Sequence, residues 1–422
     1  MPPPGAPVAS QANPVKIAVQ VRNRFLLFGC MNPLPITALT TASPIGLGLE
    51  KALLALRQGQ SGLRPNDFDD ATLPTWIGRV DAIEACTLPA ALQAFDCRNN
   101  RLAHLGLEQD GFRAAVAHAR KRWGSARIGV FLGTTTSGIL ATEQAYRARD
   151  AAGALPAGFD YAHTHSLYSV TDYVRTTLQL AGPAYSISTA CSSSAKVFAA
   201  ARRMIAAGAC DAAVVGGVDS LCHSILYGFN SLSLLSSQPC RPWDAGRDGL
   251  SLGEAAGFAL LEREADSDLA LLGYGESSDA YHMSSPHPQG MGAQLAMREA
   301  LQRAELAPHE IDYVNLHGTA TLANDRAEDQ AVSQLFGADI VCSSTKGHTG
   351  HTLGAAGITE AILSALTLRS GIVPATLHQR QADPTLHCRV LTQAQLRHPQ
   401  RVMSNSFGFG GDNCALILGR TG

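Results

Sequence analysis

The sequence has no apolar run close to the ~20 residues that a membrane-spanning helix needs, so no such helix is expected. Charge is also sparse: Asp, Glu, Lys and Arg make up 16% of the 422 residues, and the formal net charge is −2. This balance gives no electrostatic basis for binding nucleic acid or an anionic membrane surface. The ten cysteines include no CxxC pair, which argues against a zinc site or a disulfide framework and favours a reducing compartment. We therefore expect a cytoplasmic protein.

Several catalytic and cofactor-binding motifs are missing as well. The chain contains no GxxxxGK[ST], no GxGxxG and no HExxH, so neither nucleotide binding nor zinc-protease chemistry is indicated. What it does have is 45% hydrophobic residues and 40 glycines. That composition is typical of a well-buried globular enzyme with closely approaching backbones.

Residues 1–30 differ from the rest of the chain, because they are rich in proline and show no periodicity. We interpret them as a disordered N-terminal extension. From residue 36 onward, short buried strands alternate with helices, which predicts a largely parallel sheet covered on both faces. The expected strands are 36–40, 128–132, 184–188, 212–217, 312–316 and 340–344, and the expected helices are 49–56, 112–123, 195–207, 295–306 and 353–368.

The second half of this pattern repeats the first. Gly133-Thr134 and Gly318-Thr319 both follow a buried strand, and a second strand then leads through a polar loop into a small-residue helix. We infer an internal duplication of two α/β halves, residues 31–267 and 268–422. Since α/β sheets place their chemistry at the carboxyl ends of strands, the loops of both halves are expected to meet at one site.

Cys191 lies in residues 188–194 (STACSSS), between an expected strand and an expected helix. A helix N-terminus favours the thiolate and lowers the pKa of the thiol, and its free N–H groups can receive an oxyanion. A lone cysteine in such a place is more often simply a buried small side chain. Its setting favours the reactive interpretation only together with residues found later in the chain.

His317, Lys346 and His351 occupy the corresponding loops of the second half. Both histidines stand in glycine-bracketed turns after buried strands, and Lys346 follows directly from a strand. A thiol, two imidazoles and a lysine suit acyl transfer followed by carbanion chemistry. The thiolate accepts an acyl group as a thioester, and imidazole N–H groups stabilise enolate charge. No catalytic metal is required.

At this point the chain resembles the β-ketoacyl-ACP synthase family, of the elongating type II kind, from about residue 36 to residue 418. Any one of the matching motifs is weak, but their ordered set is specific. The motifs are STACS (188–192), RPWD (241–244), RDG (247–249), LGE (252–254), DAYHM (279–283), HGTAT (317–321) with Asp325 and Glu328, STKG (344–347), TGH (349–351), GAAG (354–357) and SNSFGFGG (404–411).

The resemblance implies a thiolase-like fold, in which two duplicated halves form a five-layered αβαβα core. It also implies that Cys191 accepts an acyl primer from the phosphopantetheine of an acyl carrier protein (ACP). His317 and His351 would promote malonyl decarboxylation and hold the enolate, and Lys346 would tune and orient His351. The backbone N–H groups of Cys191 and Phe409 would form the oxyanion hole, and Phe409 would act as a gate.

No organic cofactor is implied. A structural monovalent-cation site found in some family members matches four residues of this chain: Asn315, Glu360, Ser404 and Asn405.

The sequence departs from the housekeeping members of the family at three places. The loop at residues 236–240 is short and has no basic residue, which leaves the preferred carrier protein open. Thr136 replaces a larger apolar residue that limits chain length, which indicates a different or longer acyl pocket. Asp412 replaces a small hydroxyl residue, and the sequence offers no reason for this change.

We therefore predict a decarboxylative Claisen condensation of a Cys191-bound acyl chain with malonyl-ACP. The first alternative is a specialised polyketide or aryl-polyene ketosynthase that works with a non-identical chain-length partner. A homodimer and such a heterodimer both remain open. A catalytically silent chain-length subunit and a thiol hydrolase are disfavoured. The first would not need Cys191, both histidines and Lys346, and the second leaves Lys346 and one histidine unexplained.

Overall fold

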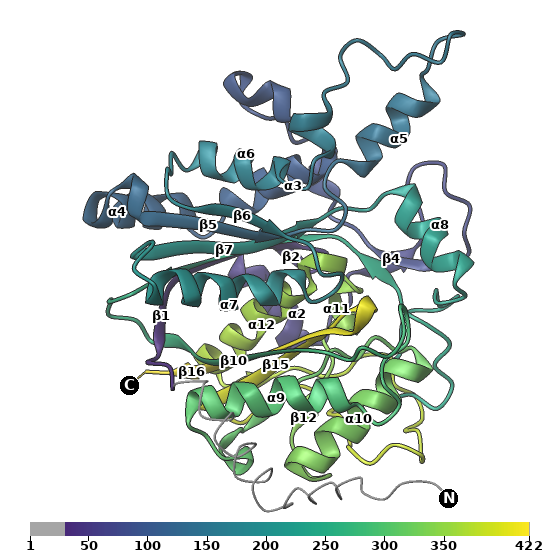
Figure 1. The fold of residues 1–422 in the computed structure, drawn as a ribbon. Helices are drawn as coiled ribbons and strands as arrows, with labels where there is room; N and C mark the ends of the chain where they lie inside the picture. Colours follow the sequence, from purple (N-terminus) through teal and green to yellow (C-terminus); the bar gives the residue numbers. More distant parts are fainter. Residues whose placement is uncertain (1–29, 422) are drawn as a thin grey trace, which may run out of the picture.

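The computed structural model describes residues 30–421, so the expected N-terminal extension lies outside the described residues except for its last residue. Two sets of five strands share one internal order (Figure 1), β6-β5-β7-β9-β1 in the first and β12-β11-β15-β16-β10 in the second. The strands are β1 (Leu34–Ser43), β5 (Ile128–Gly133), β6 (Ala184–Ile187), β7 (Ala212–Asp219), β9 (Ala255–Glu262), β10 (Leu269–Ser278), β11 (Tyr313–Asn315), β12 (Cys342–Ser343), β15 (Arg401–Phe407) and β16 (Asp412–Arg420).

The strand directions repeat as well. In the first set β5 pairs in parallel with β6 and β7, whereas β9 runs antiparallel to β7 and β1. In the second set β11 pairs in parallel with β12 and β15, and β16 runs antiparallel to β15 and β10. The predicted duplication is therefore confirmed. The expectation of a largely parallel sheet is wrong for half of the pairings within the two sets, which are antiparallel. Strands β15 and β16, for example, are joined by only four residues, 408–411, a connection too short for parallel neighbours.

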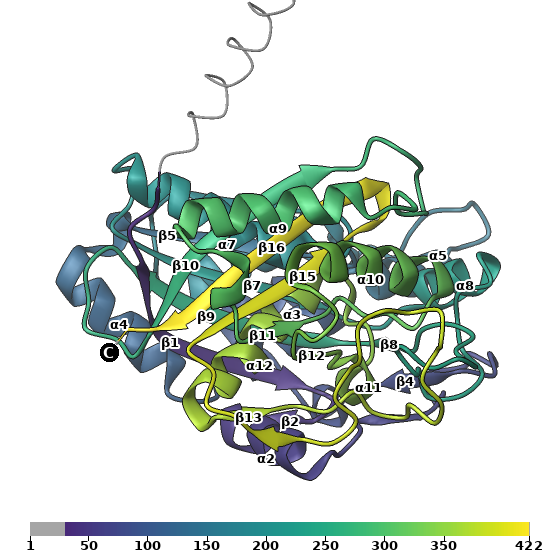
Figure 2. The same cartoon turned by 90° about the horizontal axis from the view of Figure 1, so that it is seen from below.

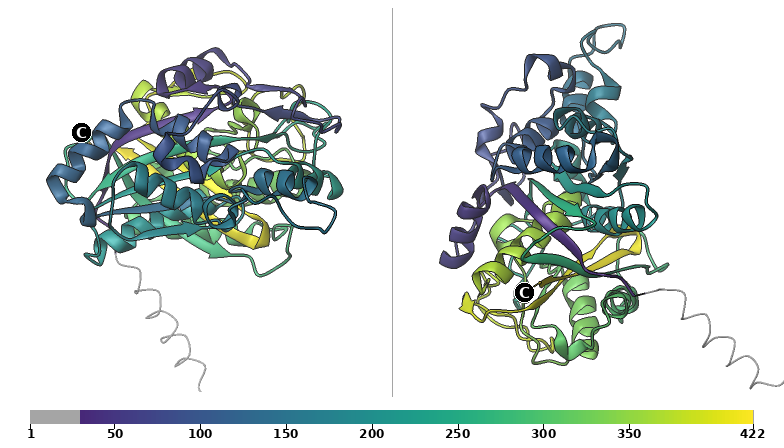
Figure 3. Two further views of the ribbon diagram at one scale, coloured as in Figure 1. Left: turned by 90° about the horizontal axis from the view of Figure 1, so that it is seen from above. Right: turned by 90° about the vertical axis from the view of Figure 1, so that its left-hand side faces the viewer.

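Helices and strands alternate in five layers, as expected. Helices α3 (Arg98–Leu107), α4 (Phe112–Trp123) and α6 (Ser169–Thr177) cover the outer face of the first set, and α9 (Met291–Ala304) covers the second, with α10 (Leu322–Phe336) beside it. Figure 2 shows α9 and α10 lying over β15 and β16. Between the two sets lie α7 (Ser193–Ala206) and α12 (Ala356–Ser370). The side view in Figure 3 shows the two halves stacked on each other.

The remaining elements connect or cover the edges of these layers. They are β2 (Gly46–Leu47), β3 (Leu63–Pro65), β4 (Trp76–Gly78), β8 (Leu252–Gly253), β13 (Ile372–Val373) and β14 (Gln395–Leu396), with α2 (Leu49–Gln58), α5 (Ile139–Arg147), α8 (His223–Ser231) and α11 (Lys346–Thr349). Within residues 30–421, no helix combines the length and apolar character that a membrane crossing would require.

The middle layer is the densest part of the core. Every residue of α12 from Ala356 to Leu368 is buried, and the apolar side of α7 packs against it. The two helices approach so closely near their N-termini that a Cβ on Gly357 would lie 2.5 Å from the Ala195 nitrogen. Glycine is therefore required at position 357. This contact brings the loops before the two helices to one place.

Candidate active site

Cys191 stands on a sharp turn just before α7. Ala190 adopts a φ of 50°, in the left-handed region that L-residues with a side chain rarely occupy. The hydroxyl of Ser193, the first residue of α7, fixes this turn: it accepts a hydrogen bond from the Thr189 N–H at 2.9 Å and donates one to the Ala190 carbonyl at 2.5 Å. The strained residue thus lies directly before the nucleophile, and local side-chain bonds hold it there.

The pKa of the Cys191 thiol differs from the sequence-based expectation. Burial raises it to about 11, and the charge of Lys346 and a hydrogen bond from the Phe409 backbone N–H lower it only in part. The lowered pKa expected at a helix N-terminus is not found, because the loss of solvation outweighs the charge of Lys346 and the Phe409 N–H. The thiol needs a base at hand when it reacts.

The imidazole of His351 is in position to act as that base. Its Nε2 lies 2.9 Å from the Cys191 Sγ, and both side chains are buried. The backbone of His351 is fastened to the strand region of the first half, since its N–H donates to the Ser251 carbonyl at 2.7 Å and its carbonyl accepts from the Gly253 N–H at 2.9 Å. The nucleophile of one half and the base of the other are thus positioned by contacts across the duplication.

His317 faces the same place from the end of β11. Its ring centroid lies 5.3 Å from that of His351, with the planes at 86°. The Lys346 Nζ lies 3.3 Å from the His317 Nδ1 and donates to the His317 carbonyl at 2.5 Å. Since an ammonium group can only donate, Nδ1 is the acceptor, and the proton of the neutral ring is on Nε2.

Both histidines are held neutral. Burial lowers the pKa of His317 well below its usual value, and the charges of Lys346 and protonated His351 lower it further. Burial followed by the charge of Lys346 does the same for the pKa of His351. Neutral imidazole N–H groups inside an apolar pocket are well suited to stabilise developing oxyanion charge.

Lys346 itself is buried and forms an ion pair with Glu360 of α12. Burial raises the pKa of Glu360 to about 7, and Lys346 opposes that rise. The lysine was expected to orient His351, but within residues 30–421 its side-chain ammonium bonds to His317 and Glu360. Its effect on His351 is therefore that of a nearby charge.

Glu328 of α10 is a positioning residue to which sequence reasoning gave no role. Its two carboxylate oxygens accept the backbone N–H groups of His317 and Gly318, each at 2.8 Å. Burial raises the pKa of Glu328 to about 7, and the Gly318 and His317 N–H groups lower it in part. The only sequence signal was its place, eleven residues after His317 within a matched motif.

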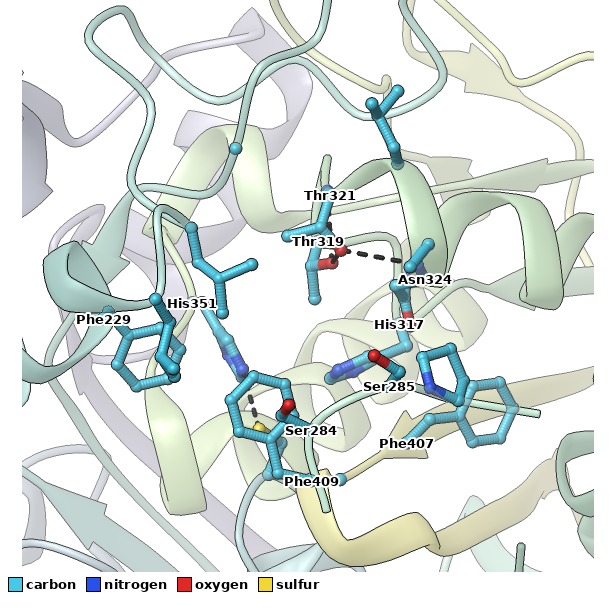
Figure 4. A pocket seen from close by; sticks show the side chains of 18 of the residues that line it. Phe229, Ser284, Ser285, His317, Thr319, Thr321, Asn324, His351, Phe407 and Phe409 are labelled. Carbon is cyan, nitrogen blue, oxygen red and sulfur yellow. Dashed lines mark hydrogen bonds between the residues drawn. The ribbon is translucent and has the colours of Figure 1, made fainter. Parts of the chain in front are cut away.

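Cys191, His317 and His351 open onto a pocket of about 370 Å³. Figure 4 shows the imidazoles of His317 and His351 pointing into it, with Phe409 nearby. The Phe409 ring stacks on Phe229 of α8, with centroids 5.7 Å apart and planes at 18°. The Phe409 ring therefore lines the same pocket as Cys191, at the position expected of a gate.

Thr136 is not among the residues that line this pocket. Its hydroxyl and N–H both bond to Asp219 at 2.9 Å. Asp219, at the end of β7, is fully buried and accepts six hydrogen bonds in total, from residues 134–136 and from the Gly354 N–H. The polar residue at position 136 thus donates hydrogen bonds to a buried carboxylate.

Three of the four residues matched to a cation site lie together. Asn315 and Ser404 are neighbours on β11 and β15, and the Asn315 amide lies 3.5 Å from the Glu360 carbonyl. One buried side-chain oxygen on each of these three residues has no hydrogen-bond partner: Asn315 Oδ1, Glu360 Oε2 and Ser404 Oγ. Oxygen donors without partners suit a hard cation. The Asn405 side chain points to the other face of β15, where its amide contacts Glu328 at 3.2 Å.

Two groups of side chains could also hold a metal ion by their spacing. The ligand atoms of Cys191, His317 and His351 lie within 4.8 Å of one another, so a thiophilic ion bound there would block the nucleophile. His223 faces Asp69 and Asp70 at 2.9 and 3.3 Å. Both carboxylates are exposed, and a hydrogen bond between the His223 imidazole and Asp69 accounts for the shorter contact.

Two family models match the chain, the beta-ketoacyl synthase N-terminal domain over residues 31–267 and its C-terminal domain over residues 270–380. The chain belongs to the β-ketoacyl synthase family. It is 33% identical over 414 residues to 3-oxoacyl-[acyl-carrier-protein] synthase 2 of Coxiella burnetii, covering 91% of this chain and 98% of that protein.

This β-ketoacyl synthase is also similar to solved structures of ketosynthases with a chain length factor. The ketosynthase ApeO in complex with its chain length factor ApeC, from Xenorhabdus doucetiae, is 39% identical with a TM-score of 0.85, covering 92% of this chain and 98% of that one. The ishigamide ketosynthase/chain length factor is 27% identical with a TM-score of 0.84, covering 92% and 99%.

These matches confirm the expected thiolase-like fold and the expected class of reaction. This β-ketoacyl synthase is an acyltransferase that condenses an enzyme-bound acyl chain with malonyl-ACP to give 3-oxoacyl-ACP and carbon dioxide. The principal and the alternative interpretation share that chemistry.

Proposed function

We propose that Cys191 carries the growing chain, that His317 and His351 perform the decarboxylation, and that the chain works beside a non-identical chain-length subunit. The observation that carries the first two roles is the contact between His351 Nε2 and Cys191 Sγ at 2.9 Å, with neutral His317 facing the same pocket.

The first step is acyl transfer. The Cys191 sulfur gives its proton to His351 Nε2 and attacks the thioester carbonyl of acyl-ACP. The backbone N–H groups of Cys191 and Phe409 receive the oxyanion. The carbon–sulfur bond to the phosphopantetheine then breaks, and that thiolate takes the proton from His351. The acyl group remains on Cys191, and His351 is neutral again.

The second step consumes malonyl-ACP. In this step the neutral His351 ring carries its proton on Nε2, and the Nε2–H groups of His317 and His351 donate to the malonyl thioester carbonyl, so that its oxygen carries the enolate charge when the bond to the carboxylate breaks and carbon dioxide leaves. The enolate carbon attacks the acyl carbonyl on Cys191. The carbon–sulfur bond breaks, and the Cys191 thiolate takes up a proton from water. Lys346 contributes by keeping both rings unprotonated.

The non-identical partner is supported by one feature of the surface. Strand β6 ends the first strand set, and no strand of residues 30–421 pairs with its outer edge. Large apolar side chains are exposed on and beside it: Tyr161, Leu167, Tyr168 and Tyr185. An unpaired strand edge with exposed aromatics is typical of a surface that another chain covers. The 39% identity to a ketosynthase solved with a chain length factor favours such a subunit over a second copy.

We include a structural monovalent cation in the proposal, because side-chain oxygens of Asn315, Glu360 and Ser404 have no hydrogen-bond partner, and Glu360 also pairs with Lys346. When bound, the ion would satisfy these oxygens and fix the Lys346–Glu360 pair. Its signature is a higher melting temperature in potassium or sodium chloride than in choline chloride at equal ionic strength. The difference should disappear in Ser404→Ala.

Two variants test the roles of the residues. Cys191→Ala should lose acylation and condensation completely, yet still release carbon dioxide from malonyl-ACP, because both histidines remain. His351→Ala should still accept an acyl group from acyl-ACP, more slowly, and should lose decarboxylation by about 10²-fold or more. Intact-mass analysis and labelled carbon dioxide release measure both. Undiminished condensation by Cys191→Ala would refute the assignment of the nucleophile.

The partner is tested with the purified chain alone. We expect it to be deficient in elongation of acyl-ACP substrates until a chain-length subunit is co-expressed, with a 1:1 heterodimer seen by native mass spectrometry. A stable homodimer that elongates acyl-ACP at full rate would contradict the heterodimer and favour the fatty-acid interpretation. Replacing Tyr185 on β6 by Lys should weaken whichever dimer forms.

A further inference from the structure

The loop that carries Phe409 is fastened to the nucleophile helix by an ion pair. The carboxylate of Asp412, the residue directly after this loop, accepts a hydrogen bond from the Lys196 ammonium at 2.7 Å. Lys196 lies on α7, five residues beyond Cys191. The residue at position 412, which the sequence left unexplained, thus has a specific partner next to the reactive centre.

This ion pair is partly shielded from solvent. The Lys196 side chain is only 12% exposed and that of Asp412 is 38% exposed. A largely buried ammonium without a partner is costly, whereas a shielded pair is less weakened by solvent than a fully exposed one. Lys196 therefore favours the conformations in which the Asp412 carboxylate stays in contact with α7.

The loop itself is rich in glycine. Of its four residues, 408–411, three are glycines, and Gly410 and Gly411 have φ values of 80° and 78°. Backbone hydrogen bonds also hold it: the Gly408 N–H donates to the Asp412 carbonyl at 2.8 Å, the Gly410 N–H donates to the Met283 carbonyl at 2.8 Å, and the Gly411 carbonyl accepts from the Asp279 N–H at 2.9 Å. The Lys196–Asp412 pair is the side-chain ion pair that ties the base of the loop to α7 within residues 30–421.

We propose that the Lys196–Asp412 pair is a latch that holds Phe409 closed over Cys191, and that its strength sets how often the nucleophile is accessible. The latch rests on the proposed function only in that Cys191 is the group being guarded. With the latch intact, Phe409 stacks on Phe229 and its N–H points at the sulfur. With the latch broken, the glycine loop opens more often, so Cys191 reacts faster with small reagents and the oxyanion donor is less well placed.

The test measures access to Cys191 without any carrier protein. The rate of iodoacetamide alkylation is followed by mass spectrometry of the peptide that contains Cys191, in the unmodified protein and in Lys196→Met and Asp412→Asn. We expect each variant to react about three- to fivefold faster, which corresponds to the loss of one partly shielded ion pair.

Two controls make the result specific. Arg203→Met removes another ion pair from the same helix, the one to Glu276 of β10 at 2.5 Å, and should leave the alkylation rate unchanged. The reversed pair, Lys196→Asp with Asp412→Lys, should return the rate to that of the parent. Equal rates in the parent and both single variants, or a reversed pair that behaves like the single variants, would overturn the latch.

A second readout separates this proposal from the proposed function. In the latch variants the acyl-Cys191 intermediate should hydrolyse faster and the kcat of condensation should fall, while the KM for acyl-ACP does not rise. If the parent protein is never acylated by acyl-ACP, the proposed function fails, yet the alkylation rates still decide the latch. If the parent is acylated but all alkylation rates are equal, only the latch fails.

Discussion

The two halves of the molecule have the same strand order and directions, but they use the same loops differently. After β5, residues 134–136 turn inward and bond to the buried Asp219. After β11, His317 and Gly318 give only their backbone N–H groups to the buried Glu328, so the His317 ring is free to face the pocket. In each half, a buried carboxylate thus accepts hydrogen bonds from this loop. Only in the second half does the loop present a reactive side chain.

The middle helices differ in a corresponding way. Helix α7 follows the nucleophile and keeps its basic residues at partly exposed positions, whereas α12 is buried along 13 residues and carries Glu360 inside the core. That buried carboxylate is tolerated because Lys346 neutralises it. The first half therefore supplies the nucleophile, and the second supplies the charges that tune the acid–base groups.

Breaking the buried pair should give the largest effect on stability. At pH 8, above the pKa of about 7 of Glu360, Lys346→Met and Glu360→Gln should each lower the free energy of unfolding by roughly 3 kcal/mol, because each leaves one buried charge without its partner. The double variant should lose clearly less than the sum of the two. Urea denaturation of all four proteins measures this. Additive losses would mean that the two side chains are not energetically coupled.

The charge of Lys346 should also be visible in the pH profile. The neutral histidines lose activity only when they become protonated, so decarboxylation of malonyl-ACP should persist well below pH 6.5. Without the positive charge, the pKa of both rings rises. The acid limb of Lys346→Met should therefore move to higher pH by about one unit. The control is Lys196→Met, whose acid limb should stay with that of the parent. An unmoved limb in Lys346→Met would refute the electrostatic role.

The smallest effect on stability is expected at the two equivalent loop positions, Thr136 and Thr321. Thr136→Val removes a buried hydroxyl that bonds to Asp219 and accepts from the Ser220 N–H, so it should cost about 1–2 kcal/mol of stability and leave product length unchanged. Thr321 lines the pocket, and its cap bond to the Asn324 N–H is long, at 3.4 Å. Thr321→Val should cost less. A changed product length in Thr136→Val would restore position 136 to the acyl pocket.

Much of this site followed from local sequence patterns. Periodicity and glycine-bracketed turns located Cys191, His317, Lys346 and His351 at strand ends, and the doubled pattern predicted that these ends meet, because sheets place strand-end loops on one edge. The helix after His351 begins at Ala356 rather than at residue 353, since Leu353–Ala355 form a 3-10 turn with Leu353 at a φ of 56°. Such a shift is invisible to periodicity.

What the sequence by itself determined is the set of reactive groups, the duplication and the class of chemistry, because these depend on residue types and spacings along the chain. Only the tertiary structure decided how those groups behave. Burial raises the pKa of Cys191 and lowers those of the histidines, Lys346 contacts His317 rather than His351, and Thr136 serves Asp219. Lys196 and Asp412, which form an ion pair, are 216 positions apart in the chain. Solvation and long-range contacts of this kind depend on what surrounds a residue in space, which no local pattern contains.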